Sequence, residues 1–249
     1  MTFHPVRLTQ DQRVAPPDGA EDVWFNAKDG TRLHGWYFPG REPKAITIVY
    51  FHGNGGNISN VGWLGQALAR RGFGVLLFDY RGYGLSAGTA ENESDLYLDG
   101  EAAVAFLTTE KRIASETVVL YGQSLGTAIA TETATRTSPG ALILESGFSS
   151  ASSVASTALP WLPRFLHVLG KNRFESARKL GTLKIPVLVS HGDPDPIIPT
   201  EEGRVLFAAA NEPKKLLIVP GAGHNVFGSA GTAYLDQLEE FIRRATESR

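Results

Sequence analysis

Short runs of apolar residues recur along the chain and predict its β-strands. The first two, DVWFNA and LHGWYFP, flank the sequence KDGT, whose Asp-Gly pair is typical of a tight hairpin turn. Six further runs have continuous apolar stretches, as strands do when helices cover both faces of a parallel sheet. They are AITIVYF (45–51), GVLLFDY (74–80), TVVLYG (117–122), ALILES (141–146), PVLVSH (186–191) and KLLIVP (215–220). The pattern predicts a mostly parallel eight-stranded sheet that begins with an antiparallel hairpin.

Helical periodicity fills most of the gaps between these runs. Val61, Leu64 and Leu68 fall on one face of a helix that Gly72 ends. Near the C-terminus, apolar residues between 235 and 242 form a stripe opposite charged ones. Strands that alternate with helices predict an α/β fold with helices on both faces of the sheet. Since the sequence has no internal repeat and no linker, we expect residues 1–249 to form a single domain.

The longest stretch between two predicted strands, residues 148–184, departs from this alternation. Its apolar segment STALPWLPRFLHVLG is interrupted by two prolines, which predicts short helices laid over one end of the sheet. These are either ordinary packing helices or a small lid. As a lid, the segment would line a substrate groove with Trp161, Phe165 and Leu166.

Composition narrows the classes of function. The net charge is −2, from 24 basic and 26 acidic residues, which offers no basic field for nucleic acid or anionic lipid. The chain has no cysteine, so disulfides, thiolate metal sites and cysteine nucleophiles are excluded. Neither a signal peptide nor an apolar run long enough to span a membrane is present. We expect a soluble, cytoplasmic protein with a small-molecule substrate and no metal or other cofactor; the oligomeric state is left open.

The segment LYGQSLGTAIA, residues 120–130, places Ser124 between glycines where a strand-like run gives way to a helix-like one. G-x-S-x-G is common by chance, but a preceding strand and a following helix are the context that an exposed nucleophile needs. Small flanking residues permit a turn sharp enough to lift the hydroxyl off the sheet edge. The N–H group of Leu125 then lies at a helix N-terminus, where it can stabilise an oxyanion. We predict that Ser124 is a nucleophile rather than part of an ordinary turn.

A serine hydroxyl needs a general base near neutral pH, and six histidines are candidates. His224 lies in the glycine-bearing loop VPGAGHNVFG after the last predicted strand, where it has room to reach the serine. The other five have other assignments: His4 to a loose N-terminus, His34 to the second strand, His167 to the lid, and His52 and His191 to turns at strand ends. We therefore predict His224 as the base.

The base needs a carboxylate to orient its ring, and the loop SHGDPDPIIP offers two. Asp195 stands between two prolines, which suits a fixed orienting role, whereas Asp193 can instead cap the turn. Both follow a parallel strand at its C-terminal end, where such sheets carry their chemistry. Asp79 and Glu145 also end strands and are less favoured candidates.

A second oxyanion donor is expected from the loop after the third strand. That loop reads YFHGNGGNIS, and its glycines let a backbone N–H group, best placed at Asn54, approach the substrate. The alternative for a glycine-rich loop is phosphate binding. The loop lacks both the G-x-G-x-x-G spacing and the Gly-Lys-Ser/Thr of a P-loop, so a nucleotide site is disfavoured.

Taken together, HGNGGN, DYRGYGLSAG, GQSLG, HGDPDPIIP and GAGHN resemble, in this order, the motifs of the α/β-hydrolase superfamily. Within it the chain is most similar to the cap-poor abhydrolase-domain serine hydrolases, related to acyl-protein thioesterase-like and prolyl-oligopeptidase-like branches. The match spans about Val23 to the C-terminal helix. Thr127 departs from the pattern, because many relatives carry a second glycine there, and it is expected to crowd the helix against the sheet.

The resemblance implies a catalytic triad of Ser124, Asp195 and His224, with the acid four positions after the histidine of its strand end. It also implies an oxyanion hole formed by Asn54 and Leu125. The activity that follows is hydrolysis of carboxylic esters with short to medium acyl chains through an acyl-enzyme. An acyl-protein thioesterase or a serine peptidase is the alternative, and a non-catalytic binding protein with the same fold is an alternative of another class.

Overall fold

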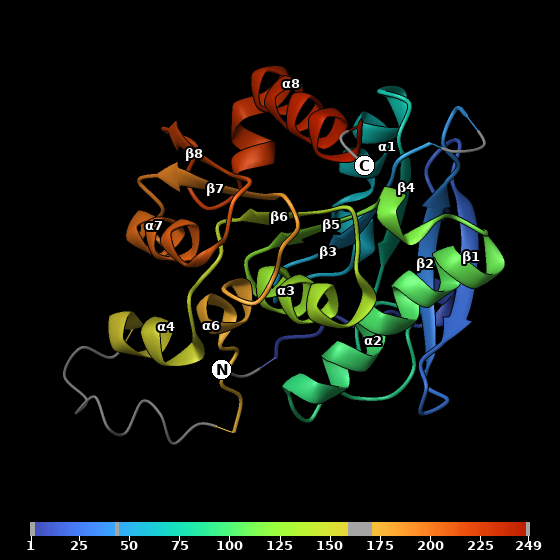
Figure 1. Ribbon diagram of the computed structural model, residues 1–249. Coiled ribbons are helices and arrows are strands. Elements are labelled where there is room, and N and C mark those ends of the chain that lie inside the picture. The colour runs from blue at the N-terminus through green and yellow to red at the C-terminus, as the bar shows by residue number, and fades with distance from the viewer. Residues whose placement is uncertain (1–2, 43–44, 159–170, 248–249) are drawn as a thin grey trace.

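The central sheet is the feature that organises the molecule (Figure 1). The structure, a computed structural model, describes residues 3–42, 45–158 and 171–247. Within these residues eight strands form one sheet in the order β1-β2-β4-β3-β5-β6-β7-β8. They are β1 (Glu21–Asn26), β2 (Arg32–Phe38), β3 (Thr47–Phe51), β4 (Gly74–Phe78), β5 (Val118–Gln123), β6 (Ala141–Glu145), β7 (Val187–Asp193) and β8 (Lys214–Pro220).

Strand direction agrees with the sequence pattern. β1 pairs antiparallel with β2, and β2 antiparallel with β4, whereas all the remaining neighbours pair in parallel. The predicted hairpin followed by a parallel sheet is confirmed. β7 extends further than predicted, because its pairing with β8 continues to Asp193 opposite Pro220. His191 therefore lies inside the strand and not at its end.

Helices cover both faces of the sheet, as predicted (Figure 1). They are α1 (Gly62–Arg70), α2 (Glu93–Ala105), α3 (Leu125–Thr137), α4 (Ala151–Ala158), α6 (Ser176–Leu180), α7 (Thr200–Ala209) and α8 (Val226–Glu247). Short 3₁₀ turns lie at Gln10–Gln12, Ile58–Asn60 and Ser115–Thr117, and a π-helical turn lies at Phe106–Glu110.

Two apolar cores form, one on each face, because successive residues of a strand point to opposite sides. On β3, Ile48 faces the core beneath α1 and α8, whereas Val49 faces the core beneath α2, α3 and α7. The predicted helix stripes are buried in the first of these cores: Leu68 of α1 and Leu238 of α8 have no exposed surface. Burial of a residue of this size stabilises the fold by about 1.5–3 kcal/mol.

The segment between β6 and β7 is described in part. Its first part contains α4 and its last part contains α6, while Trp161, Phe165 and Leu166 lie outside the described residues. The carboxylate of Glu202, on α7, accepts a hydrogen bond from the N–H of Ser149 at 2.7 Å. Glu93, on α2, accepts one from the N–H of Phe174 at 2.6 Å. Each described end is thus tied to a helix of the main fold.

No helix within the described ranges combines the length and apolar character needed to cross a bilayer.

The connection from β5 to α3 is tightly packed. A Cβ atom on Gly126 would lie 1.9 Å from the carbonyl oxygen of Phe51, and one on Gly122 would lie 2.4 Å from that of Gly126. Thr127, expected to crowd the helix, is fully buried, and its hydroxyl donates to the carbonyl of Ser124 at 2.7 Å. Gly147 faces that hydroxyl and provides the space for it.

We expect Gly126→Ala to destabilise the protein strongly, because the added methyl group collides with the backbone of β3. Overpacking of this kind costs about 2–3 kcal/mol, which lowers the melting temperature of a chain of this size by about 5–10 °C. Gly181→Ala is the matched control, since its nearest neighbour would lie at 3.6 Å. Thermal unfolding of both variants checks this, and equal melting temperatures would contradict it.

Candidate active site

Ser124 occupies the turn between β5 and α3 in a strained conformation. Its φ is 52° and its ψ is −119°, a left-handed region that residues other than glycine rarely adopt. A backbone hydrogen bond ties the turn to the neighbouring strand β6, because the N–H of Ser124 donates to the carbonyl of Glu145 at 2.9 Å. Leu125 begins α3, and the first N–H groups of a helix have no partner within the helix. Ser124 and Leu125 thus have the positions predicted from the sequence.

His224 and Asp195 are in direct contact. Nδ1 of His224 lies 2.7 Å from Oδ2 of Asp195. The other carboxylate oxygen, Oδ1, accepts hydrogen bonds from the N–H groups of Ile197 at 2.8 Å and Ile198 at 3.0 Å. With Nδ1 donating to the carboxylate, the lone pair of the neutral ring is on Nε2, the arrangement that a general base requires.

The environment of Asp195 favours its ionised form. Burial raises the pKa of its carboxyl group, but hydrogen bonds from His191, His224 and two backbone N–H groups outweigh this and hold the pKa well below its usual range. The carboxylate is therefore charged at neutral pH and can stabilise a protonated imidazole. Asp193, the other candidate in this loop, lies exposed at the end of β7.

His191 has a contact that the sequence did not reveal. Its Nε2 lies 2.9 Å from the carbonyl oxygen of Ile198 and 3.2 Å from Oδ2 of Asp195. His191 lies inside β7, and its side chain is fully buried. The histidine assigned from sequence to a turn thus also faces the carboxylate beside His224.

Ser124 and His224 line one cleft of about 310 Å³, together with Asn54. Trp63 and Ile197 also line it and are unusually exposed for their type, at 45% and 63%. No lysine, arginine, aspartate or glutamate of the described chain lines this cleft. A larger cavity of about 460 Å³ lies against β8 and the end of α8, and none of the predicted site residues lines it.

Asn54 lies in the loop after β3, and two other segments hold its side chain. The hydroxyl of Tyr83 lies 3.1 Å from Oδ1 of Asn54, and the N–H of His4 donates to the same atom at 3.1 Å. Val6 reinforces this contact, because its carbonyl accepts hydrogen bonds from the N–H of Gly84 and from the side chain of Asn57. His4 and Val6 thus connect the N-terminal segment to the loop that carries Asn54.

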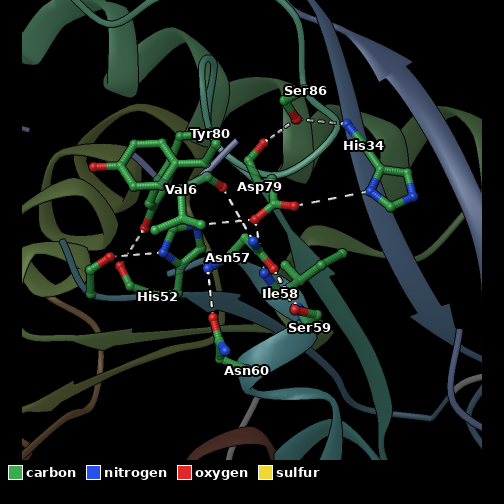
Figure 2. Close-up of polar contacts among 12 residues, drawn as sticks. Val6, His34, His52, Asn57, Ile58, Ser59, Asn60, Asp79, Tyr80 and Ser86 are labelled. Atoms are coloured by element: carbon green, nitrogen blue, oxygen red, sulfur yellow. Dashed lines mark hydrogen bonds and ion pairs between the residues drawn. The ribbon is translucent and has the colours of Figure 1, made fainter. Parts of the chain in front are cut away.

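Asp79 holds the same loop through Ile58, as Figure 2 shows. Its buried carboxylate accepts the N–H of Ile58 at 2.9 Å, with Nε2 of His52 at 3.6 Å and Nδ1 of His34 at 4.0 Å. The hydroxyl of Ser86 adds a contact to the backbone of Asp79, because it donates to the Asp79 carbonyl at 2.7 Å. Burial lowers the pKa of His52, although the nearby Asp79 charge opposes this, so the neutral form of the ring is favoured.

Asp79 and Glu145, the less favoured acids, have partners other than His224 in the described structure. Asp79 faces His52 and His34, whereas Glu145 accepts hydrogen bonds from α8 and two tyrosines. The sequence identified both acids as candidates because they lie at strand ends. Their actual partners could not be predicted, because these come from segments distant in the sequence. Within the described residues, no group of three or more histidine and carboxylate side chains is placed to hold a metal ion.

The fold and the serine turn define a class of protein. A mostly parallel eight-stranded sheet, covered on both faces, with a serine at positive φ between β5 and α3, is the α/β-hydrolase architecture. Residues 41–180 match the Hydrolase_4 family, described as serine aminopeptidase, S33, and the chain belongs to this family of α/β hydrolases.

Three relatives match most of the chain. The chain is 39% identical to the uncharacterized protein Rv2307c of Mycobacterium tuberculosis, over 89% of this chain and 78% of that one. It is 36% identical to YfhR of Escherichia coli, over 94% and 85% of the two chains. Human alpha/beta hydrolase domain-containing protein 17B is 34% identical, over 90% and 76%.

Solved structures show the same fold. The esterase Pf2001 of Pyrococcus furiosus superposes with a TM-score of 0.78 at 20% identity, over 98% of each chain. The esterase RhEst1 of Rhodococcus superposes with a TM-score of 0.71 at 18% identity, over 89% of this chain and 98% of that one. The predicted α/β-hydrolase fold is confirmed.

We expect Asp79→Leu to lower the free energy of unfolding by about 1–3 kcal/mol, because it leaves the buried N–H of Ile58 without an acceptor. Asp79→Asn is the matched control, since its amide oxygen can still accept that hydrogen bond. Denaturant titration of both variants measures the difference. Equal stability of the leucine and asparagine variants would show that the contact does not support the loop.

Proposed function

We propose that this protein is a serine hydrolase that cleaves carboxylic esters with short to medium acyl chains. The observation that carries the proposal is the 2.7 Å contact between His224 and Asp195, in a cleft that Ser124 also lines. In this proposal Ser124 is the nucleophile, His224 the base and Asp195 the residue that orients and stabilises the imidazolium.

The reaction follows from these roles. Nε2 of His224 takes the Ser124 proton as the oxygen attacks the ester carbonyl carbon, and a tetrahedral oxyanion forms. The N–H groups of Asn54 and Leu125 stabilise that oxyanion, and each donor of such a pair is worth about 3–4 kcal/mol. The intermediate collapses when His224 returns the proton to the leaving alcohol. Water, activated by the same histidine, then hydrolyses the acyl-enzyme and frees Ser124.

The cleft favours an uncharged ester over the substrate of an aminopeptidase. An aminopeptidase must hold the free ammonium group of its substrate, which calls for an anionic side chain. Among the described residues, none of the side chains that line the cleft is a carboxylate. The exposed Trp63 and Ile197 instead offer apolar surface for an acyl group. Trp161, Phe165 and Leu166 stay part of the proposal as further acyl-binding residues.

We expect a fluorophosphonate probe to label the wild-type protein and to leave Ser124→Ala unlabelled. The probe reacts with an activated serine hydroxyl, which that variant lacks. Ser229→Ala, at an exposed position, should label like the wild type. Mass spectrometry of the intact proteins measures the adduct. An unlabelled wild type would point to the non-catalytic binding protein, and a labelled Ser124→Ala would exclude Ser124 as the nucleophile.

We expect kcat/KM for methyl butanoate to exceed that for monomethyl succinate by at least about tenfold. Both acyl groups are short, but the second would place an unpaired carboxylate in a cleft that offers no cation. Titration of the released acid at constant pH measures both rates. Equal values would show that charge is not selected against in this cleft.

A further inference from the structure

Glu145, at the end of β6, is a buried carboxylate that the proposed reaction does not use. Only 1% of the residue is exposed. A charge so far from water is costly unless several hydrogen-bond donors surround it. Glu145 has such donors, and they come from the two segments that carry Ser124 and His224.

The side chain of Glu145 holds the start of α8. Its Oε1 accepts hydrogen bonds from the N–H groups of Val226 at 3.0 Å and Phe227 at 3.3 Å. These two residues follow directly after His224 and Asn225. The carboxylate therefore fixes the C-terminal end of the loop in which His224 lies.

The main chain of Glu145 holds the serine turn. Its carbonyl accepts the hydrogen bond from the N–H of Ser124 at 2.9 Å. The second carboxylate oxygen, Oε2, accepts the hydroxyl groups of Tyr121, on the same strand as the turn, and of Tyr234, on α8. One residue thus bonds to the serine turn, its strand β5 and the helix that follows the histidine.

We propose that Glu145 is a positioning residue that sets the place of His224 relative to Ser124. The inference rests on the proposed function, in which these two residues exchange a proton. Glu145 touches no reacting atom and acts through its contacts with the backbone of the two segments and with the hydroxyl groups of Tyr121 and Tyr234. Displacement of a catalytic group by about 1 Å can cost about a hundredfold in rate. Loss of the Glu145 contacts should therefore change kcat more than KM.

The contacts also specify which property of Glu145 matters. Burial raises the pKa of Glu145, although its hydrogen bonds oppose this shift. The N–H groups of Val226 and Phe227 need an acceptor oxygen, which an amide provides as well as a carboxylate does. An amide nitrogen can in turn donate to the tyrosine oxygens. Glutamine at position 145 should therefore preserve the function of Glu145, whereas leucine should not.

The experiment compares Glu145→Leu and Glu145→Gln with the wild type. For the leucine variant we expect kcat to fall about 10–100-fold, with KM within about threefold. Hydrogen exchange at the amides of Val226 and Phe227 should accelerate in that variant. The glutamine variant should keep kcat within about threefold of the wild type, and the exchange of both amides should stay slow.

A second variant serves as the control that separates the loss of positioning from a general loss of stability. Leu77→Ala removes fully buried volume from β4 and should lower the melting temperature without loss of kcat. A Glu145→Leu variant with the kcat of Leu77→Ala, or with unchanged exchange at Val226 and Phe227, would overturn the proposal. If the leucine variant does not fold, Glu145→Asp takes its place, because it withdraws the carboxylate by one methylene group and should show the same losses.

Failure of the proposed function would look different. A wild type that neither reacts with fluorophosphonate nor hydrolyses esters contradicts the hydrolase, whatever Glu145 does. Hydrogen exchange at Val226 and Phe227 then tests the inference by itself. Faster exchange in Glu145→Leu supports the link that Glu145 makes between α8 and the serine turn, and unchanged exchange overturns it.

Discussion

The turn at Ser124 imposes the constraint around which this structure is built. A serine can keep φ at 52° only if the segments on either side are held firmly, since the conformation is strained. β5 is held between β3 and β6, and α3 packs so closely against β3 that Gly126 has no space for a side chain. The strain at Ser124, the tight packing at Gly126 and the position of the serine hydroxyl at the C-terminal end of β5 are therefore consequences of the same β5–α3 connection.

The charges near this turn are arranged by the same sheet. The loops after β3, β5, β6, β7 and β8 leave at the same end of the parallel strands, which brings distant residues together. Asp195 stays ionised because its hydrogen bonds outweigh the penalty of burial. Asp79 and Glu145 are buried carboxylates that accept backbone N–H groups instead. Three acids at the ends of parallel strands thus have different surroundings, and in our proposal only Asp195 orients the histidine.

Much of the fold could be predicted from local sequence, because apolar runs and turn residues depend on short-range physics. The eight strands and the helices on both faces are confirmed on that basis. The parts that were missed depend on tertiary contacts: β7 continues to Asp193 because β8 lies beside it, and the N–H of His4 donates to the distant Asn54. For the site, motif order predicted which residues to bring together, but it contained no information on His191 or Glu145 as their neighbours.

The central claim is that a carbonyl attacked by Ser124 is met by two backbone N–H groups while His224 holds the proton. A crystal structure of the fluorophosphonate adduct tests this most directly. The account predicts phosphorus bonded to the Ser124 oxygen, with the phosphoryl oxygen about 2.7–3.1 Å from the nitrogens of Asn54 and Leu125 and His224 still bonded to Asp195. A phosphoryl oxygen that avoids both N–H groups, or a His224 ring turned away from Asp195, would contradict it.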